Sequence, residues 1–151
     1  MPRSPSRSYS YSVTAHSPAA PGAVYAALVR ASTWPVWSPI DAAGIEGGGD
    51  PAAPQQAGDV RVFRTGRTVS RERVIDLVPD RRLVYDNLGG PFHSYRGTVG
   101  LAPAPDGGTD ITWSAVFVPK PRGTGRFWRW YLTRFMGRMA DGLAAYAAGT
   151  S

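Results

Sequence analysis

Apolar and polar side chains alternate along five segments in the middle of the chain, which is the pattern of half-buried β-strands. The segments are residues 59–65, 67–78, 81–88, 95–102 and 109–118. Turn sequences rich in Gly, Pro and Asp separate them. Connections this short favour antiparallel pairing, because a parallel pair needs a crossover of about a dozen residues. The middle of the chain therefore predicts an antiparallel sheet.

The N-terminal part of the chain predicts a strand, a helix and a turn, in that order. Residues 9–15 (YSYSVTA) alternate with the period of a strand. Ser17 is a candidate N-cap for a helix that ends near Ala31. Two prolines then restrict residues 34–39 (WPVWSP) to a turn or a one-turn helix. The Gly, Pro and Ala residues of 44–59 predict a loop.

Residues 124–148 predict one long amphipathic helix. Its apolar stripe recurs at spacings of three and four and consists of Trp128, Tyr131, Leu132, Phe135, Met139, Leu143 and Tyr146. Gly137 and Gly142 weaken the helix propensity by about 1 kcal/mol each relative to Ala, but they also permit close approach of another surface. The complete order predicts an α+β fold, in which this helix covers one face of the sheet. An aromatic helix gripped by a curved sheet favours a ligand cavity between the two.

Composition indicates one globular domain. The chain has 151 residues, of which 42% are hydrophobic and 19% charged. We expect residues 1–8 to form a disordered tail and residues 9–148 the single domain. The chain contains no cysteine, which excludes disulfides and thiolate chemistry. Since no apolar run approaches the roughly 20 residues of a membrane span and no signal peptide is visible, we expect a cytoplasmic protein.

The net charge of +6 is concentrated at the C-terminal end, where residues 120–151 carry six basic side chains against Asp141. Two interpretations remain open. The favoured one is a solvated basic face of the predicted helix, and the other is a surface for an anionic membrane or a partner protein. Nucleic acid is not expected as a partner, because the aromatic side chains are predicted to face inward.

Three stretches resemble the SRPBCC superfamily, which includes polyketide cyclases/dehydrases, START proteins and birch-pollen-allergen-like proteins. They are SPAAPGAVYAALVRASTWPVWSP, RERVIDLVPDRRLVYDN and YRGTVGLAPAPDGGTDITW. The resemblance extends over residues 9–148. It implies a helix-grip fold, that is, a curved antiparallel sheet wrapped around a long C-terminal helix, with an apolar cavity between them. The superfamily includes enzymes and lipid carriers, so the resemblance leaves both open.

Strand alternation predicts which polar side chains enter that cavity. His93, Tyr95 and Arg73 are the candidate catalytic residues: His93 as the acid or base, Tyr95 as a hydrogen-bond donor, Arg73 as an anchor for an anion or a carbonyl. The alternative for His93 is a solvated position in the turn, and for Arg71 and Arg73 an outward orientation beside acidic neighbours. A β-bulge in either strand would invert the assignment.

The candidate ligand-binding residues are mostly aromatic and apolar. They are Trp34, Trp37, Phe63, Arg71, Tyr85, Asn87, Trp113, Phe117, Tyr131, Phe135 and Met139. No metal site is predicted, because two histidines without an acidic cluster do not form one. No phosphate-binding loop or dinucleotide motif is present, so we expect no cofactor.

Three functions follow from this pattern, and all involve a hydrophobic small molecule or a surface. We favour a cofactor-free cyclase/dehydrase acting on a polyketide-like intermediate. The first alternative is a non-catalytic carrier of lipid-like or aromatic ligands. The second is a protein that binds a membrane surface or a partner through its basic C-terminal helix. We leave a homodimer open.

Overall fold

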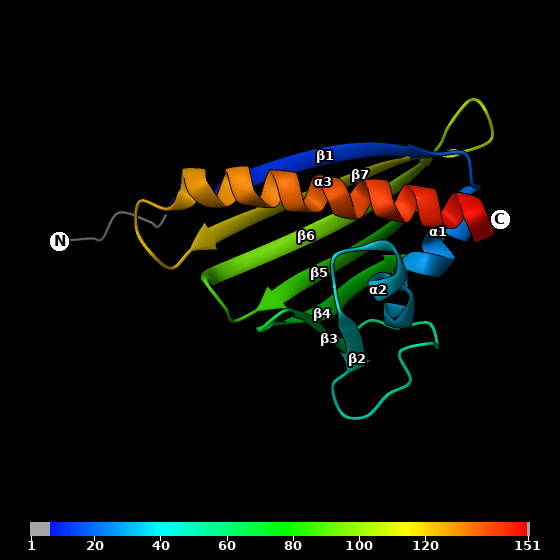
Figure 1. The fold of residues 1–151 in the computed structure, drawn as a ribbon. Helices are drawn as coiled ribbons and strands as arrows, with labels where there is room; N and C mark the ends of the chain where they lie inside the picture. The colour runs from blue at the N-terminus through cyan, green and yellow to red at the C-terminus, as the bar shows by residue number, and fades with distance from the viewer. Residues whose placement is uncertain (1–6, 151) are drawn as a thin grey trace.

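The computed structural model, which describes residues 7–150, contains one seven-stranded antiparallel sheet (Figure 1). The strand order is β1-β7-β6-β5-β4-β3-β2. The strands are β1 (Tyr9–Ser17), β2 (Ala42–Ile45), β3 (Val60–Thr65), β4 (Thr68–Val78), β5 (Arg82–Leu88), β6 (Phe92–Pro103) and β7 (Thr109–Pro119). Strand β1 pairs with β7, so the first and last strands lie side by side at one edge. Residues 1–6 of the predicted tail lie outside the described residues.

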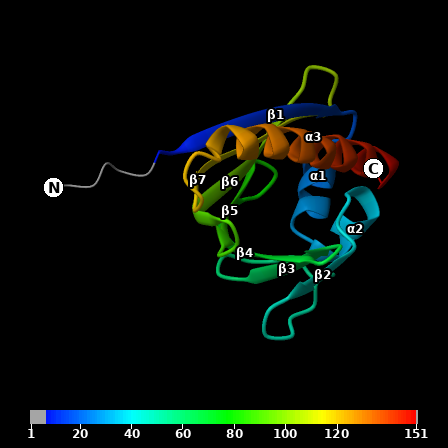
Figure 2. The ribbon, with the colours of Figure 1, turned by 60° about the vertical axis from the view of Figure 1, so that its left-hand side comes forward.

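One long helix and three short helical segments complete the fold. Helix α3 (Gly125–Thr150) runs along the inner face of the sheet, close to β1. Helix α1 (Pro21–Leu28), the 3₁₀ turn η1 (Ala31–Thr33) and helix α2 (Trp34–Trp37) connect β1 to β2. Figure 2 shows the sheet curving from β1, beside α3, round to β3 and β2. This is the helix-grip arrangement, and it confirms the predicted α+β fold class.

The structure differs from the predicted elements at three places. Residues 42–45 form strand β2, although the predicted loop begins at residue 44. Strand β6 starts at Phe92, within the predicted turn. Ser17 does not cap α1: it ends β1, and its hydroxyl donates to the Ala144 carbonyl in α3. Helix α1 begins instead at Pro21, whose missing N–H costs nothing in the first turn.

The core lies between α3, the short helices and the inner face of the sheet. Trp34 and Trp113 are fully buried, and their rings meet edge to face with centroids 5.6 Å apart. The Trp113 indole N–H donates to the Tyr85 hydroxyl at 3.0 Å. Buried Trp and Tyr side chains are stable when their polar atoms find such partners. These contacts fix the central strands relative to the short helices.

His16 links the end of β1 to Asp106 in the turn between β6 and β7 and to Asp110 at the start of β7. Its ring nitrogens lie 2.8 Å from an Asp106 carboxylate oxygen and 3.0 Å from one of Asp110. The hydrogen bonds to Asp110 and Asp106 raise the pKa of His16 above its ordinary value. His16 thus has a structural role on the surface of the protein, and it does not lie on the face of the sheet that α3 covers.

The two glycines singled out in the long helix have different surroundings. A Cβ on Gly142 would lie 1.9 Å from the Trp37 carbonyl oxygen, whereas one on Gly137 would meet nothing within 4 Å. We expect Gly142→Ala to destabilise the fold by about 1–3 kcal/mol through overpacking. Gly137→Ala should stabilise it by up to about 1 kcal/mol, the difference in helix propensity. Urea unfolding of both variants measures the two shifts, and a stabilising Gly142→Ala would contradict the close approach.

No helix among the described residues is both long enough and apolar enough to cross a membrane.

Candidate functional site

A cavity of about 410 Å³ lies between the first half of α3 and strands β3 to β6. Its volume is in the range of small-molecule sites, roughly 300–1,000 Å³. The wall comprises Trp34, Ile40, Phe63, Thr65, Thr68, Val69, Ser70, Glu72, Tyr85, Asn87, Leu88, Gly90, Pro91, Phe92, Tyr95, Phe127, Trp128, Tyr131, Leu132, Phe135, Met136 and Met139. Most of these side chains are apolar or aromatic, and the polar ones come chiefly from β4 and β5.

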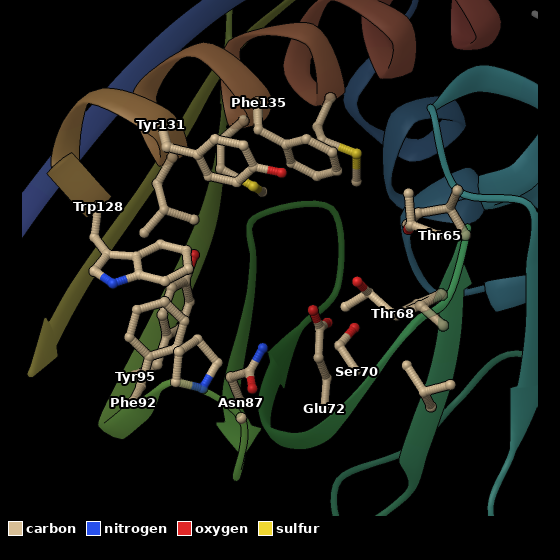
Figure 3. Close-up of a pocket in the computed structure, with 18 of the residues that line it drawn as sticks. Thr65, Thr68, Ser70, Glu72, Asn87, Phe92, Tyr95, Trp128, Tyr131 and Phe135 are labelled. Atoms are coloured by element: carbon tan, nitrogen blue, oxygen red, sulfur yellow. The ribbon is translucent and has the colours of Figure 1, made fainter. Parts of the chain in front are cut away.

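Helix α3 supplies the aromatic side of the cavity. Figure 3 shows Trp128, Tyr131 and Phe135 pointing from the helix toward the space above the sheet. The rings of Tyr131 and Phe135 stack with centroids 6.1 Å apart, and Trp128 meets Phe92 of β6 edge to face at 5.1 Å. Ring contacts of this kind hold large side chains in place. The helix therefore presents a preformed wall for a flat or apolar ligand.

The sheet supplies a row of polar side chains opposite that wall. Glu72 of β4 lies between Arg61 of β3 and Asn87 of β5 in the strand register. Residues paired across antiparallel strands share a face of the sheet, so all three point toward the helix side. Ser70, two residues before Glu72, lies on the same face, and Figure 3 shows both side chains directed into the cavity.

Arg61 and Glu72 form an ion pair beneath the cavity. Their closest N–O distance is 3.3 Å, and 0% of the Arg61 side chain and 12% of the Glu72 side chain are exposed. A second Arg61 nitrogen, Nη1, donates to the Leu28 carbonyl at 3.0 Å, while the guanidinium lies 4.4 Å from the Trp34 ring. The Arg61 Nε has no hydrogen-bond partner among the described residues. Of the two charges, only the Glu72 carboxylate reaches the cavity.

Burial raises the pKa of Glu72 above its ordinary value, and the attraction of Arg61 offsets only part of that rise. A carboxyl with a raised pKa exchanges protons more readily near neutral pH than an exposed one. Glu72 is therefore the group in the cavity wall best suited to move a proton.

Three tyrosine hydroxyls gather on the inner face of β1, β5 and β6. The hydroxyls of Tyr11 and Tyr95 form a short hydrogen bond, and that of Tyr85 lies close to both. Burial raises the pKa values of all three phenols, so they stay protonated at neutral pH. Tyr85 and Tyr95 line the cavity. They are thus available as neutral hydrogen-bond donors.

The predicted inward orientation of Arg71 and Arg73 is wrong, because a β-bulge interrupts β4. The register passes from Val74, opposite Tyr85, to Asp76, opposite Val84, leaving Ile75 as the extra residue. The inward orientation was predicted by strict alternation from Leu77. The extra residue reverses that alternation, so the residues before the bulge point to the opposite face from the one predicted. Arg71 instead forms an exposed ion pair with Glu46 at 2.6 Å, and Arg73 is exposed on the outer face.

The predicted inward orientation of His93 is wrong for the same reason. The register of β6 shifts between Phe92 and Ser94, so His93 is the extra residue there. Phe92 and Tyr95 both point inward, three residues apart, and His93 is exposed. Tyr95 remains in the cavity wall, but His93 does not line it.

Most of the predicted ligand-binding residues lie in the wall and three lie behind it. The structure places Trp34, Phe63, Tyr85, Asn87, Tyr131, Phe135 and Met139 in the cavity wall. Trp37, Trp113 and Phe117 are buried in the core without lining the cavity. Sequence reasoning missed Ser70 and Glu72, which are in the wall, and Arg61 behind them. The apolar spacing of three between Val74 and Leu77, unusual for a strand, was the available signal for the bulge.

Within residues 7–150 no group of three or more histidine or acidic side chains is arranged to hold a metal ion.

Comparison with known proteins gives the family. The family model described as polyketide cyclase / dehydrase and lipid transport matches residues 8–148. None of the curated proteins matches the chain in sequence.

Solved structures share the fold at low sequence identity. A START superfamily protein from Mycobacterium smegmatis has a TM-score of 0.77 at 13% identity, covering 94% of this chain and 99% of its own. A norcoclaurine synthase point mutant from Thalictrum flavum has a TM-score of 0.76 at 13% identity, covering 98% and 99%. The di-domain ARO/CYC protein StfQ from the steffimycin biosynthetic pathway has a TM-score of 0.72 at 18% identity, and the match covers 94% of this chain and 52% of StfQ. At these identities the likeness establishes the fold alone. The family match and the helix-grip fold together show that the chain belongs to the polyketide cyclase/dehydrase and lipid transport family of the SRPBCC superfamily.

Proposed function

We propose that the protein binds a hydrophobic, oxygen-bearing small molecule in its cavity and catalyses a cyclase/dehydrase reaction with Glu72 as acid and base. The observation that carries the proposal is the single carboxylate in a largely apolar and aromatic cavity wall. The family description supports the reaction class, since it names polyketide cyclase / dehydrase beside lipid transport. In this proposal Glu72 takes the acid/base role that was predicted for His93 from the sequence.

The arrangement suits ring closure of a chain that carries several carbonyl groups. The Glu72 carboxylate takes a proton from the carbon between two carbonyls, and the electron pair of that C–H bond forms an enolate. The hydroxyls of Tyr85 and Tyr95 donate to the carbonyl that becomes negative. The enolate carbon attacks a carbonyl farther along the chain, whose C=O electron pair moves to oxygen, so that a new C–C bond and an alkoxide form. Protonated Glu72 returns its proton to that oxygen, which becomes a hydroxyl. Glu72 then takes the second proton from the same carbon, the electron pair of that C–H bond forms a C=C bond as the C–O bond breaks, and Glu72 gives this proton to the departing hydroxyl, which leaves as water.

A non-catalytic carrier is the alternative, and one observation favours it. Two pairs of polar groups near the cavity already satisfy each other: Glu72 is paired with Arg61, and the Tyr11 hydroxyl is paired with that of Tyr95. A ligand without polar atoms would then be held by the aromatic wall alone. The two functions share the same site and differ in whether product forms.

Ligand binding tests what the two functions have in common. An environment-sensitive apolar dye or a flat polyphenol should bind with micromolar affinity, about −8 kcal/mol, and raise the melting temperature. Phe135→Glu should abolish this binding, because it puts an unpaired charge into the wall. Val116→Glu is the matched control, since Val116 is 56% exposed on β7 and does not line the cavity. Equal binding by both folded variants would contradict the proposed site.

A further inference from the structure

Three aromatic side chains near the start of α3 are exposed to solvent. The exposed fractions are 54% for Phe127, 59% for Trp130 and 43% for Tyr131. The Phe127 ring lies against both others, with centroids 6.2 Å from Tyr131 and 6.4 Å from Trp130. We call these three residues the aromatic face. Contiguous exposed apolar surface of this kind marks an interaction site.

Basic side chains lie beside Trp130 of the aromatic face. Residues 120–140 contain Lys120, Arg122, Arg126, Arg129, Arg134 and Arg138, and no acidic residue. Arg126, Arg129 and Arg134 line a shallow hollow together with Trp130 and Thr133. The Arg134 guanidinium lies 5.7 Å from the Trp130 ring centroid. The surface therefore combines exposed rings with a strong local positive charge.

The aromatic face is continuous with the cavity. Phe127 and Tyr131 belong to both, being exposed on α3 while lining the cavity wall. Tyr131 in turn stacks on Phe135, which Figure 3 shows farther along the same wall. A row of rings thus leads from the outer surface of the helix into the ligand site.

We propose that the aromatic face docks the protein on an anionic lipid bilayer, with the cavity opening at the level of the headgroups. Trp and Tyr rings favour the interface between headgroups and acyl chains, and clustered Arg and Lys bind anionic lipid surfaces. The hollow beside Trp130 suits a headgroup phosphate. This inference goes beyond the proposed function and holds for an enzyme or a carrier alike, because either would take an apolar ligand directly from the bilayer.

The same observations argue against two other occupants. A second copy of the chain would bring two positively charged faces together, and like charges repel. Single-stranded nucleic acid is bound in grooves that combine stacked bases with a tracked backbone, whereas this face lies on one helix and offers only the shallow hollow beside Trp130. Charge and shape therefore favour a bilayer.

Sedimentation with lipid vesicles tests the proposal. The protein should bind phosphatidylcholine vesicles that contain phosphatidylserine. It should dissociate from them at high salt, and it should not bind vesicles of pure phosphatidylcholine. Arg126→Glu should weaken binding roughly 25-fold, at about 5-fold per unit of charge. Trp130→Ser should weaken it by about 10-fold or more through lost apolar burial. Arg81→Glu, in the exposed turn before β5, and Val116→Ser, on the outer side of β7, are the matched controls and should bind as the parent does.

The outcomes separate docking from the ligand site. Neither Arg126 nor Trp130 lines the cavity, so both variants should keep the parent's affinity for the apolar dye. Loss of vesicle binding with dye binding retained supports the proposal. Equal vesicle binding by Arg126→Glu and Arg81→Glu would overturn it. So would tighter binding to single-stranded DNA than to vesicles, or a dimer in solution that Trp130→Ser dissociates.

Discussion

Glu72→Gln will lower turnover of a polyketide-like substrate by roughly 10²–10⁴-fold, the usual contribution of a positioned acid or base. Glutamine keeps the size of the side chain and still accepts a hydrogen bond from Arg61, but it does not take up a proton at neutral pH. Ligand affinity should change little, since the aromatic wall is intact. The measurement is product formation from synthetic poly-β-ketothioesters, followed by mass spectrometry.

His93→Ala is the control for that loss. His93 is exposed at a bulge and does not line the cavity, so its removal should leave turnover unchanged. The pH–rate profile provides a second readout: the limb that reports the base should fall above the ordinary pKa of a glutamate, because burial raises that of Glu72. Unchanged turnover in Glu72→Gln, or its loss in His93→Ala, would refute the role of Glu72. Ligand bound by every variant with no product from any of them would establish the carrier.

Arg61→Met will destabilise the fold by about 3–5 kcal/mol, because it leaves the Glu72 carboxylate without its counter-charge. Arg61→Met with Glu72→Leu should recover most of that loss, since no unpaired charge then remains beneath the cavity. Urea unfolding of the two single variants and the double variant gives the coupling between the residues. The double variant should be stable and yet inactive, which separates the structural role of the pair from its chemical one.

Arg71→Met is the matched control on the neighbouring strand. Its ion pair with Glu46 is exposed on both sides, 44% and 48%, and exposed pairs contribute less than about 1 kcal/mol. Equal losses for Arg61→Met and Arg71→Met would contradict the burial of the first pair. So would a double variant no more stable than either single one.

The same pair sets a pH dependence of stability. Burial raises the pKa of Glu72 in the folded protein, so the folded state holds this proton more tightly than the unfolded chain does. The stabilisation that this proton gives the folded state is complete below the ordinary pKa of a glutamate. It is lost as the pH rises through the pKa that Glu72 has in the folded protein. Replacing both members of the pair should remove this part of the slope.

The sequence predicts the fold because two patterns extend over many residues, so that a local irregularity such as a β-bulge does not hide them. The stripe from Trp128 to Tyr146 and the repeated alternation of the strands specify a helix on an antiparallel sheet. Strand β2 was missed, because Ala42–Ile45 has only four residues, and its first three are alanine and glycine, which give no alternation. Gly142 was correctly expected to permit close approach, and the Trp37 backbone is the surface it meets.

Tyr85, Asn87 and Tyr95 were placed correctly, but the polar residues of β4 were not predicted and His93 was misplaced, because two bulges reverse the strand faces. Alternation has a period of two, so one extra residue moves every later side chain to the opposite face. The bulge at Ile75 exchanges Arg71 and Arg73 for Ser70 and Glu72 in the cavity wall. The bulge at His93 turns this residue, the expected base, away from the cavity. The apolar residues of α3 were less affected, because a helix face depends on several turns at once.

Methyl NMR of the two cavity methionines tests the central claim, that the space between α3 and the sheet is the ligand site. Met136 and Met139 both line the cavity, and ¹³C-labelled Met methyl groups are assigned by Met136→Leu and Met139→Leu. On titration with the apolar ligand, both resonances should shift and saturate together, with the affinity found by fluorescence. A ligand that binds with that affinity and moves neither resonance would contradict the claim.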